Sequence, residues 1–251
     1  MSLAASTEIR ALLLDIEGTT TPIEFVSKTL FPFAAARVEG FLREHSDNPE
    51  TKQIIADLRQ TWSGAAAAGA PVWIETTPEE KLSSAAAYVR WLIARDSKIT
   101  ALKSLQGKIW EAGYRDGQLK GAVYPDVGPA FARWRSQGRR IAIFSSGSVL
   151  AQKLLFAHST AGDLSSCLDA YFDTTTGPKR EATSYRKIAA ALELEPPQVL
   201  FVSDVAAELD AAAATRMRTM HSLRPGTPLP DGPIHASIDS FEQLFRDPAR
   251  A

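Results

Sequence analysis

Four short apolar runs, each followed by a polar stretch of mostly small residues, constrain the fold of this 251-residue chain more than any other feature. The runs are IRALLL (9–14), RIAIF (140–144), AYF (170–172) and VLFV (199–202). Helical patterns lie between the last three: VLAQKLLFAH begins after Ser148, a favoured helix N-cap, and SYRKIAAALEL ends before two prolines. Strands that alternate with helices predict an α/β fold with a doubly wound, mainly parallel sheet.

The first run is separated from the second by more than a hundred residues, too many for a single crossover connection. Segments in this stretch, such as TKQIIADLRQTW and PEEKLSSAAAYVRWLIARD, repeat apolar residues at the spacing of a helix face. We therefore predict two domains. Residues 1–24 and 119–251 form the core, and residues 25–118 form an all-helical domain inserted after the first strand.

The polar stretches at the strand ends hold the best candidates for catalytic and ligand-binding residues. In a doubly wound sheet, ligands bind beyond the carboxyl ends of the strands. The candidates are Asp15 and Glu17 after the first strand, Ser145 and Ser146 after the second, Lys179 after the third and Asp204 after the fourth. Each has an ordinary alternative, such as a helix N-cap or a surface lysine. Their joint order nevertheless predicts one site at one edge of the sheet.

This set of groups suits phosphoryl transfer. An aspartate carboxylate can attack phosphorus, and a neighbouring carboxylic acid can protonate the leaving oxygen and later take a proton from water. Hydroxyls at a helix start and a lysine suit a phosphate. Carboxylate oxygens suit Mg²⁺, which would reduce the repulsion between the phosphate dianion and the acids.

The order D-x-[D/E]-G-T, then serine, lysine and aspartate, resembles that of the haloacid dehalogenase superfamily of phosphohydrolases. Three longer stretches are similar to the enolase-phosphatases, or acireductone synthases, of methionine salvage: DIEGTTTPIEFV (15–26), FSSGSVLAQKLLFAHSTAGDL (144–164) and YFDTTTGPKREATSYRKI (171–188). Glu17 stands where most phosphatases of the superfamily have a second aspartate. The similarity covers the core and the end of the insertion, and it is weaker around residues 47–77.

The resemblance implies an activity, a cofactor and a cap. Members of the family enolise 2,3-diketo-5-methylthiopentyl-1-phosphate and then hydrolyse the phosphate, which yields the acireductone 1,2-dihydroxy-3-keto-5-methylthiopentene. One Mg²⁺ per chain and a monomer are implied. The helical insertion looks like the superfamily's cap, which would exclude water from the site. Phe25, Trp110 and Tyr114 are candidates for an apolar wall around the methylthio tail, and ordinary helix packing explains each of them equally well.

The resemblance also implies a role for each matching residue. Asp15 matches the nucleophile and a metal ligand, and Glu17 matches the acid/base position and contributes to the metal site through its backbone carbonyl. The other matches are Ser145, Ser146 and Lys179 with substrate- and phosphate-binding positions, Asp204 with the metal-binding acid, and Glu208 with a further acid that supports the metal's surroundings. No role is implied for the histidines, which are His45, His158, His221 and His235. The base that removes the carbon-bound proton stays open.

Composition limits the partners, the cysteine chemistry and the cellular location that we expect for this chain. The formal net charge of -1 gives no reason to expect nucleic acid or a membrane as a partner, so the expected partner is a small phosphorylated molecule. The single cysteine, Cys167, excludes an internal disulfide and a multi-cysteine zinc site. The sequence shows neither a secretory signal pattern nor an apolar run long enough to span a membrane, and we expect a cytoplasmic protein.

Two other functions remain in play. A phosphatase of the same superfamily with another small phosphorylated substrate would use the same core residues without enolisation. A non-enzymatic binding protein on this fold would be expected to lack the nucleophile or the metal-binding acid, yet Asp15, Lys179 and Asp204 are all present.

Overall fold

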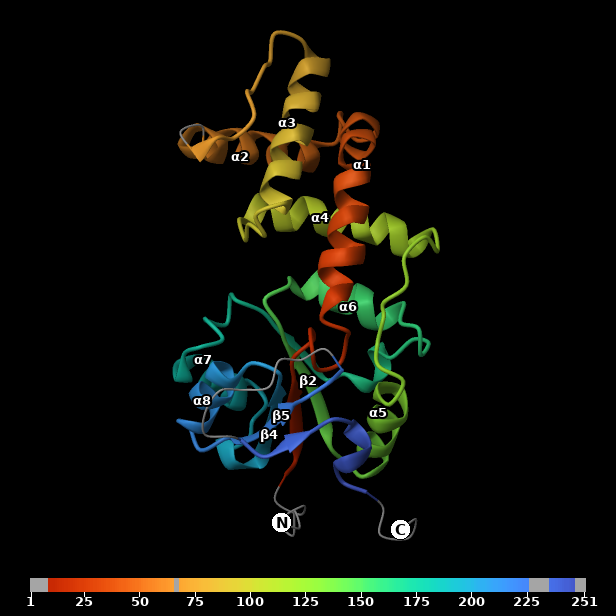
Figure 1. Cartoon of the computed structure of the whole chain (residues 1–251), viewed down its shortest axis with the longest axis vertical. Helices are drawn as coiled ribbons and strands as arrows, with labels where there is room; N and C mark the ends of the chain where they lie inside the picture. Colours follow the sequence, from red (N-terminus) through yellow and green to blue (C-terminus); the bar gives the residue numbers. More distant parts are fainter. Residues whose placement is uncertain (1–8, 66–67, 226–234, 247–251) are drawn as a thin grey trace. The chain divides into compact units, whose positions relative to one another are not determined.

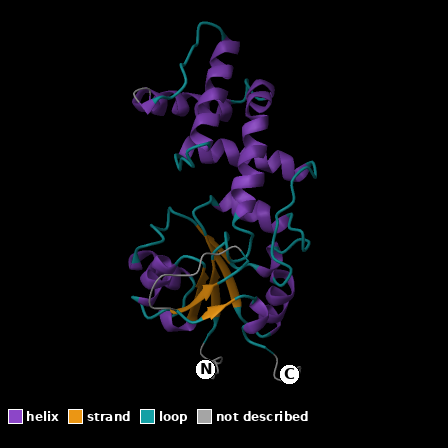
Figure 2. Ribbon diagram, in the orientation of Figure 1, coloured by secondary structure: helices purple, strands orange, loops and turns teal. Residues whose placement is uncertain are grey.

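The computed structural model describes residues 9–65, 68–225 and 235–246. The chain forms two compact units, one made of residues 1–25 with 120–251 and the other of residues 26–119 (Figure 1). Strands belong to the first unit, and the regular elements described in the second are all helical (Figure 2).

A six-stranded sheet forms the centre of the first unit, in the order β3-β2-β1-β4-β5-β6. Every neighbouring pair is parallel. The strands are β1 (Ala11–Leu14), β2 (Arg140–Phe144), β3 (Ala170–Phe172), β4 (Val199–Ser203), β5 (Arg218–Ser222) and β6 (Ser237–Ile238). Leu14 is level with Ile143 on β2 and with Val202 on β4, so the ends of these three strands meet at one edge. The predicted doubly wound α/β fold is confirmed.

Helices flank both faces of this sheet. They are α5 (Val127–Ser136), α6 (Val149–Ala157), α7 (Ala182–Ala191) and α8 (Ala206–Ala213). Figure 1 shows α7 and α8 on one side of the sheet and α5 on the other. On the α7 and α8 side, Leu13 and Phe201 of the sheet share a buried core with Tyr185 and Leu209 of the helices. Ser148 caps α6 as predicted, because its hydroxyl accepts a hydrogen bond from the Ala151 N–H at 3.3 Å.

Two strands of the sheet have no counterpart among the predicted ones. The sequence of β5, RTMHS, is mostly polar, and yet Met220, His221 and Ser222 are buried. His221 and Ser222 can be buried because each hydrogen-bonds to a backbone carbonyl of a neighbouring loop. The strand is therefore buried without being apolar, and the sequence has no apolar run that would predict it. β6 has two residues and lies at the sheet edge, too short for a periodic signal.

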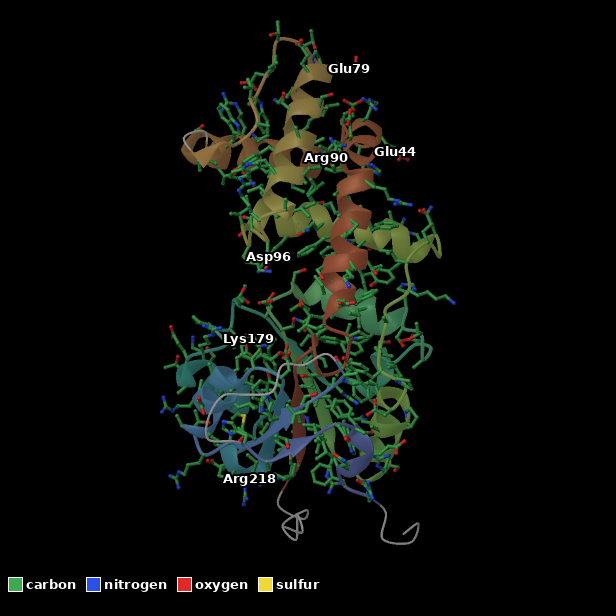
Figure 3. All side chains as sticks on the ribbon, viewed as in Figure 1. Glu44, Glu79, Arg90, Asp96, Lys179 and Arg218 are labelled. Atoms are coloured by element: carbon green, nitrogen blue, oxygen red, sulfur yellow. The ribbon has the colours of Figure 1, made fainter. Side chains whose placement is uncertain are left out.

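The second unit begins with a short π-helical segment, Val26–Leu30, and continues with α1 (Phe31–Glu44), α2 (Pro49–Ala65), α3 (Pro78–Ile93) and α4 (Thr100–Arg115). The Arg90 side chain joins α3 to α1 (Figure 3), donating to the Ala35 carbonyl at 3.1 Å and to Glu39 at 3.0 Å. Trp110 of α4 is buried, and its indole N–H donates to the Leu30 carbonyl at 2.9 Å. None of the described helices is long and apolar enough to cross a membrane.

Candidate active site

Asp15 follows β1 directly and starts the tight turn that carries Glu17. Its backbone N–H donates to the Val202 carbonyl on β4 at 3.0 Å, which ties the start of the turn to the neighbouring strand. The N–H groups of residues 19–21 all donate to the Ile16 carbonyl at 2.9 to 3.2 Å. This tight closure gives Gly18 a φ of +64°, a conformation that side chains with a Cβ rarely adopt. The sequence E-G-T after the strand therefore has a geometric cause.

Lys179 lies in the loop between β3 and α7 (Figure 3). Its side chain joins two buried carboxylates. Its Nζ lies 2.8 Å from Asp15 Oδ2 and 2.6 Å from Glu208 Oε2. The three side chains are only 8 to 11% exposed. The Ser203 hydroxyl completes a ring, at 3.1 Å from Asp15 Oδ2 and 3.2 Å from Glu208 Oε2. The Asp15 carboxylate is thus held by two groups from distant parts of the chain.

Electrostatics keep Lys179 charged. Burial lowers the pKa of Lys179, but the charges and hydrogen bonds of Asp15 and Glu208 outweigh burial and raise that pKa above its usual value. Burial and the Asp15 charge raise the pKa of Glu208, although Lys179 and Ser203 act in the opposite direction. The ammonium group therefore stays positively charged at neutral pH.

Asp204 follows β4, and its carboxylate lies against the backbone of Gly18, where a Cβ would overlap it. Burial and the nearby charge of Asp15 raise the pKa of Asp204 to about 7. The backbone carbonyl of Asp204 accepts a hydrogen bond from Nε2 of the buried His221 at 3.0 Å. Two of the predicted acids, Asp15 and Asp204, are therefore close enough to interact electrostatically.

Ser145 and Ser146 follow β2, in the loop that leads into α6. Ser145 is buried, its N–H donates to the Phe172 carbonyl at 3.2 Å, and its hydroxyl accepts from the Gly147 N–H at 3.3 Å. Gln152 fixes the loop by donating to the Gly147 and Phe172 carbonyls, both at 2.9 Å. Because β2 neighbours β1 in register, this loop and the Asp15 turn leave the same edge of the sheet.

The carboxylates at this edge of the sheet could hold a metal ion. No group of three or more His, Cys, Asp and Glu side chains suited to a metal is found within residues 9–65, 68–225 and 235–246. Mg²⁺, however, commonly uses one or two carboxylates and keeps several waters. Asp15 and Asp204 supply two hard oxygen donors. Burial, together with the nearby charge of Asp15, raises the pKa of Asp204, and a bound cation would offset this penalty on the ionised carboxylate. The residues therefore fit Mg²⁺.

Sequence reasoning missed several polar residues of this site. Ser203 holds Asp15, and three residues at the end of β5 hold the two loops: His221, Ser222 and Arg224. A weak signal existed for Ser203, since it is the polar end of an otherwise apolar strand beside Asp204. His221, Ser222 and Arg224 had no such signal, because they lie in or just after β5, a strand that the pattern of apolar residues did not predict. Glu208, expected to support the metal's surroundings, contacts Lys179 and Ser203, the two groups that hold Asp15.

Comparison with known proteins adds independent information. The profile of the haloacid dehalogenase-like hydrolases matches residues 9–215. Enolase-phosphatase E1 of Synechococcus elongatus is 54% identical over 236 residues, which are 94% of this chain and 98% of that protein. Enolase-phosphatase E1 of Sorangium cellulosum is 47% identical over 243 residues, 96% of this chain and 99% of that protein.

Solved structures show the same fold. The crystal structure of the UTR4 protein of Saccharomyces cerevisiae is similar with a TM-score of 0.78 and 36% identity, and the match covers 94% of this chain and 100% of that one. CbbY from Rhodobacter sphaeroides, crystallised in complex with phosphate, has a TM-score of 0.55 at 18% identity, covering 94% of this chain and 96% of that one. At that level of identity the second likeness concerns the fold alone.

Proposed function

Because this chain belongs to the haloacid dehalogenase-like hydrolases and, within them, to the enolase-phosphatases, we propose that it converts 2,3-diketo-5-methylthiopentyl-1-phosphate into the acireductone of methionine salvage. The observation that carries the proposal is the Asp15 carboxylate held by Lys179 at the end of β1, two residues before Glu17. A carboxylate placed in this way can attack phosphorus while the ammonium group neutralises charge on the phosphate oxygens.

The first proposed step moves a proton within the substrate. The product carries a double bond between C1 and C2, so a base must remove a proton from C1 and the C2 oxygen must gain one. We propose Glu17 as the acid/base of this step. A glutamate side chain is one methylene longer than an aspartate, so its carboxyl group reaches roughly 1.5 Å further than the residue usual at this position.

The second proposed step breaks the phosphate ester. The Asp15 carboxylate attacks phosphorus, the bond between phosphorus and the C1 oxygen breaks, and Glu17, which has taken up a proton from solvent after the first step, protonates that oxygen. Glu17 then takes a proton from water, whose oxygen attacks the aspartyl phosphate, restores Asp15 and releases orthophosphate. Loss of that proton to solvent returns Glu17 to the carboxylate that begins the next cycle. Lys179, with the Ser145 and Ser146 hydroxyls, is proposed to hold the phosphate oxygens.

The proposal includes one Mg²⁺ per chain. The Asp15 and Asp204 carboxylates and the Glu17 backbone carbonyl would hold it, which accords with the charge excess at this edge of the sheet. When bound, the ion offsets the repulsion between the phosphate dianion and the carboxylates. Lys179 cannot supply this offset alone, because Asp15 and Glu208 already share its charge.

The family resemblance supports three further parts of the proposal. The helical unit, residues 26–119, serves as the cap, and the chain works as a monomer in the cytoplasm. Light scattering coupled to size-exclusion chromatography tests the monomer, which should give the mass of a single chain.

The decisive experiment mixes the purified protein with the diketone phosphate and follows the reaction by ultraviolet absorbance and by phosphate release. It is run with Mg²⁺ and then with a chelator. An absorbing enol that appears first and phosphate that follows, both lost with the chelator, would support the two-step reaction. Asp15→Asn is the matched control, since it removes the nucleophilic charge and should stop phosphate release. Phosphate release from other phosphomonoesters without action on the diketone would point to a different small phosphorylated substrate.

A further inference from the structure

Three buried side chains, two at the end of β5 and one just after it, each bind a backbone carbonyl of the loops that carry the proposed catalytic and metal-binding acids. The contacts are Ser222 Oγ to the Gly18 carbonyl at 2.9 Å, Arg224 Nε to the Thr19 carbonyl at 3.0 Å and His221 Nε2 to the Asp204 carbonyl at 3.0 Å. The three donor residues are 0 to 5% exposed. We call His221, Ser222 and Arg224 the β5 clamp.

Arg224 is itself held in one place. Its Nη1 lies 2.7 Å from Asp126 Oδ2 and 3.1 Å from the Asp239 carbonyl. The guanidinium carbon lies 4.5 Å from the ring centres of both Tyr124 and Phe241. A planar group fixed by an ion pair and by two aromatic faces cannot follow a moving loop, so Arg224 sets where the Thr19 carbonyl lies.

The turn needs these outside donors. Its own N–H groups are used internally, since Gly18 donates to the Thr21 carbonyl and residues 19–21 donate to the Ile16 carbonyl. The carbonyls of Gly18 and Thr19 point instead to Ser222 and Arg224, and a buried carbonyl without a partner is costly. Gly18 also touches the Asp204 carboxylate, so a shift of the turn would move Glu17 and Asp204 with it.

We propose that Ser222 and Arg224 are positioning residues that fix the turn carrying Glu17, and so set its aim at the reacting atoms. The catalytic part of this inference rests on the proposed function, in which Glu17 moves the protons. The contacts of both residues are with the turn and with neighbouring parts of the core. Their effect passes through the turn, and it should appear in the rate of the chemical step rather than in substrate affinity.

Two variants and a matched control test this inference. Ser222→Ala removes one donor to the turn, and Arg224→Lys keeps the charge but loses the fixed fork that serves Thr19 and Asp126 together. Thr215→Val is the control, because the buried Thr215 hydroxyl donates to the Ala212 carbonyl at 2.7 Å, at the end of α8 and without contact to the turn. Hydrogen exchange of the 16–21 amides, thermal unfolding, kcat and KM are measured for each.

We expect faster exchange at residues 16–21 and a kcat lower by about tenfold to a hundredfold in both clamp variants, since small misplacements have effects of that size. KM should change by less than about twofold. Thr215→Val should lose comparable thermal stability and show neither effect. The inference is overturned if either the exchange rates or the kcat of Ser222→Ala match those of Thr215→Val. If Arg224→Lys does not fold, the Ser222→Ala result alone decides.

The two proposals fail separately. If the parent chain does not act on the diketone phosphate, the proposed function fails, and kcat is then measured on whichever phosphomonoester the parent hydrolyses. The exchange rates of residues 16–21 need no substrate. They test the hold of the clamp on the turn whatever the reaction is.

Discussion

Gly18 and Asp204 are in direct contact: the backbone of Gly18 lies so close to the Asp204 carboxylate that a Cβ at position 18 would overlap it. The two residues follow β1 and β4, which are neighbours in the sheet. This contact sets the spacing between the turn that follows Asp15 and the acid that follows β4. The spacing of the proposed metal ligands therefore depends on the absence of a side chain.

Gly18→Ala should lower kcat/KM by about a hundredfold and weaken Mg²⁺ binding. The new methyl group would push Asp204 aside, and the φ of +64° adds roughly 1–2 kcal/mol of backbone strain. Gly138→Ala is the control, because Gly138 has a φ of +73° and open space where its Cβ would be. Gly18→Ala should lose more stability in urea unfolding than Gly138→Ala, whose loss comes from backbone strain alone. Equal kinetic effects in the two would contradict the steric argument.

Lys179→Met should abolish most activity and also destabilise the fold. The variant leaves the buried Asp15 and Glu208 carboxylates without their cation, and breaking a buried pair in this way costs about 3–5 kcal/mol. The loss should shrink as the pH falls, because burial and the Asp15 charge already raise the pKa of Glu208, and protonation of Glu208 removes the repulsion. Chemical unfolding at pH 5 and 7 measures this.

A suitable reference for Lys179→Met is Lys187→Met. Lys187 is exposed and donates to the Thr176 carbonyl at 3.1 Å, so its loss should change stability by less than about 1 kcal/mol and leave kcat intact. A Lys179→Met protein as stable as the Lys187→Met protein would show that the buried ion pairs hold nothing in place.

Asp204 should make the metal-free protein less stable as the pH rises from 3.8 to about 7. Its pKa in the folded chain lies above its usual value, so over this window the folded state keeps a proton that the unfolded state has released. Each rise in pH therefore favours unfolding, until the window ends near pH 7. Asp204→Asn should reduce this slope, measured by urea unfolding in chelator at pH 5, 6 and 7.

Magnesium affinity should rise over the pH range in which the stability of the metal-free protein falls. A bound cation favours the ionised carboxyl group, so Mg²⁺ should bind more tightly as the pH rises toward about 7, with release of a proton. Titration calorimetry in buffers of different ionisation enthalpy measures that proton. An affinity independent of pH between 5 and 7 would mean that Asp204 does not bind the ion.

Glu17→Asp tests whether one carboxyl group serves both chemical steps. The shorter side chain should keep phosphate release from a simple phosphomonoester within about tenfold of the parent, since aspartate is usual at this position in the superfamily. Enolisation of the diketone phosphate should fall by about a hundredfold or more, because the carboxyl group no longer reaches C1. Unchanged rates for both steps would refute a role for the added methylene.

Much of the core was predictable because its strands are buried on both faces. Runs such as RIAIF and VLFV are continuous in apolar residues, and the C-terminal ends of parallel strands must share an edge. That geometry alone brings Asp15 and Asp204 together from opposite ends of the chain, as the structure shows.

The supporting contacts were not predictable in the same way. Ser203 bonds Asp15 across 188 positions of sequence, and Ser222 bonds Gly18 across 204. A single serine has no periodicity, and the partner of Ser222 is a backbone carbonyl, which every residue possesses. The donors of β5 are polar and buried together, so they hide the strand on which they lie.

The position of β1 has a consequence for how the protein is made. β1 is the first strand in the chain, yet it lies between β2 and β4, which begin at Arg140 and Val199. On the ribosome, the apolar segment ALLL therefore emerges long before either neighbour exists, and the whole helical unit is synthesised between β1 and β2. Throughout that interval the segment is exposed to other nascent chains and to chaperones, and the catalytic edge of the sheet can form only after β4 has been synthesised.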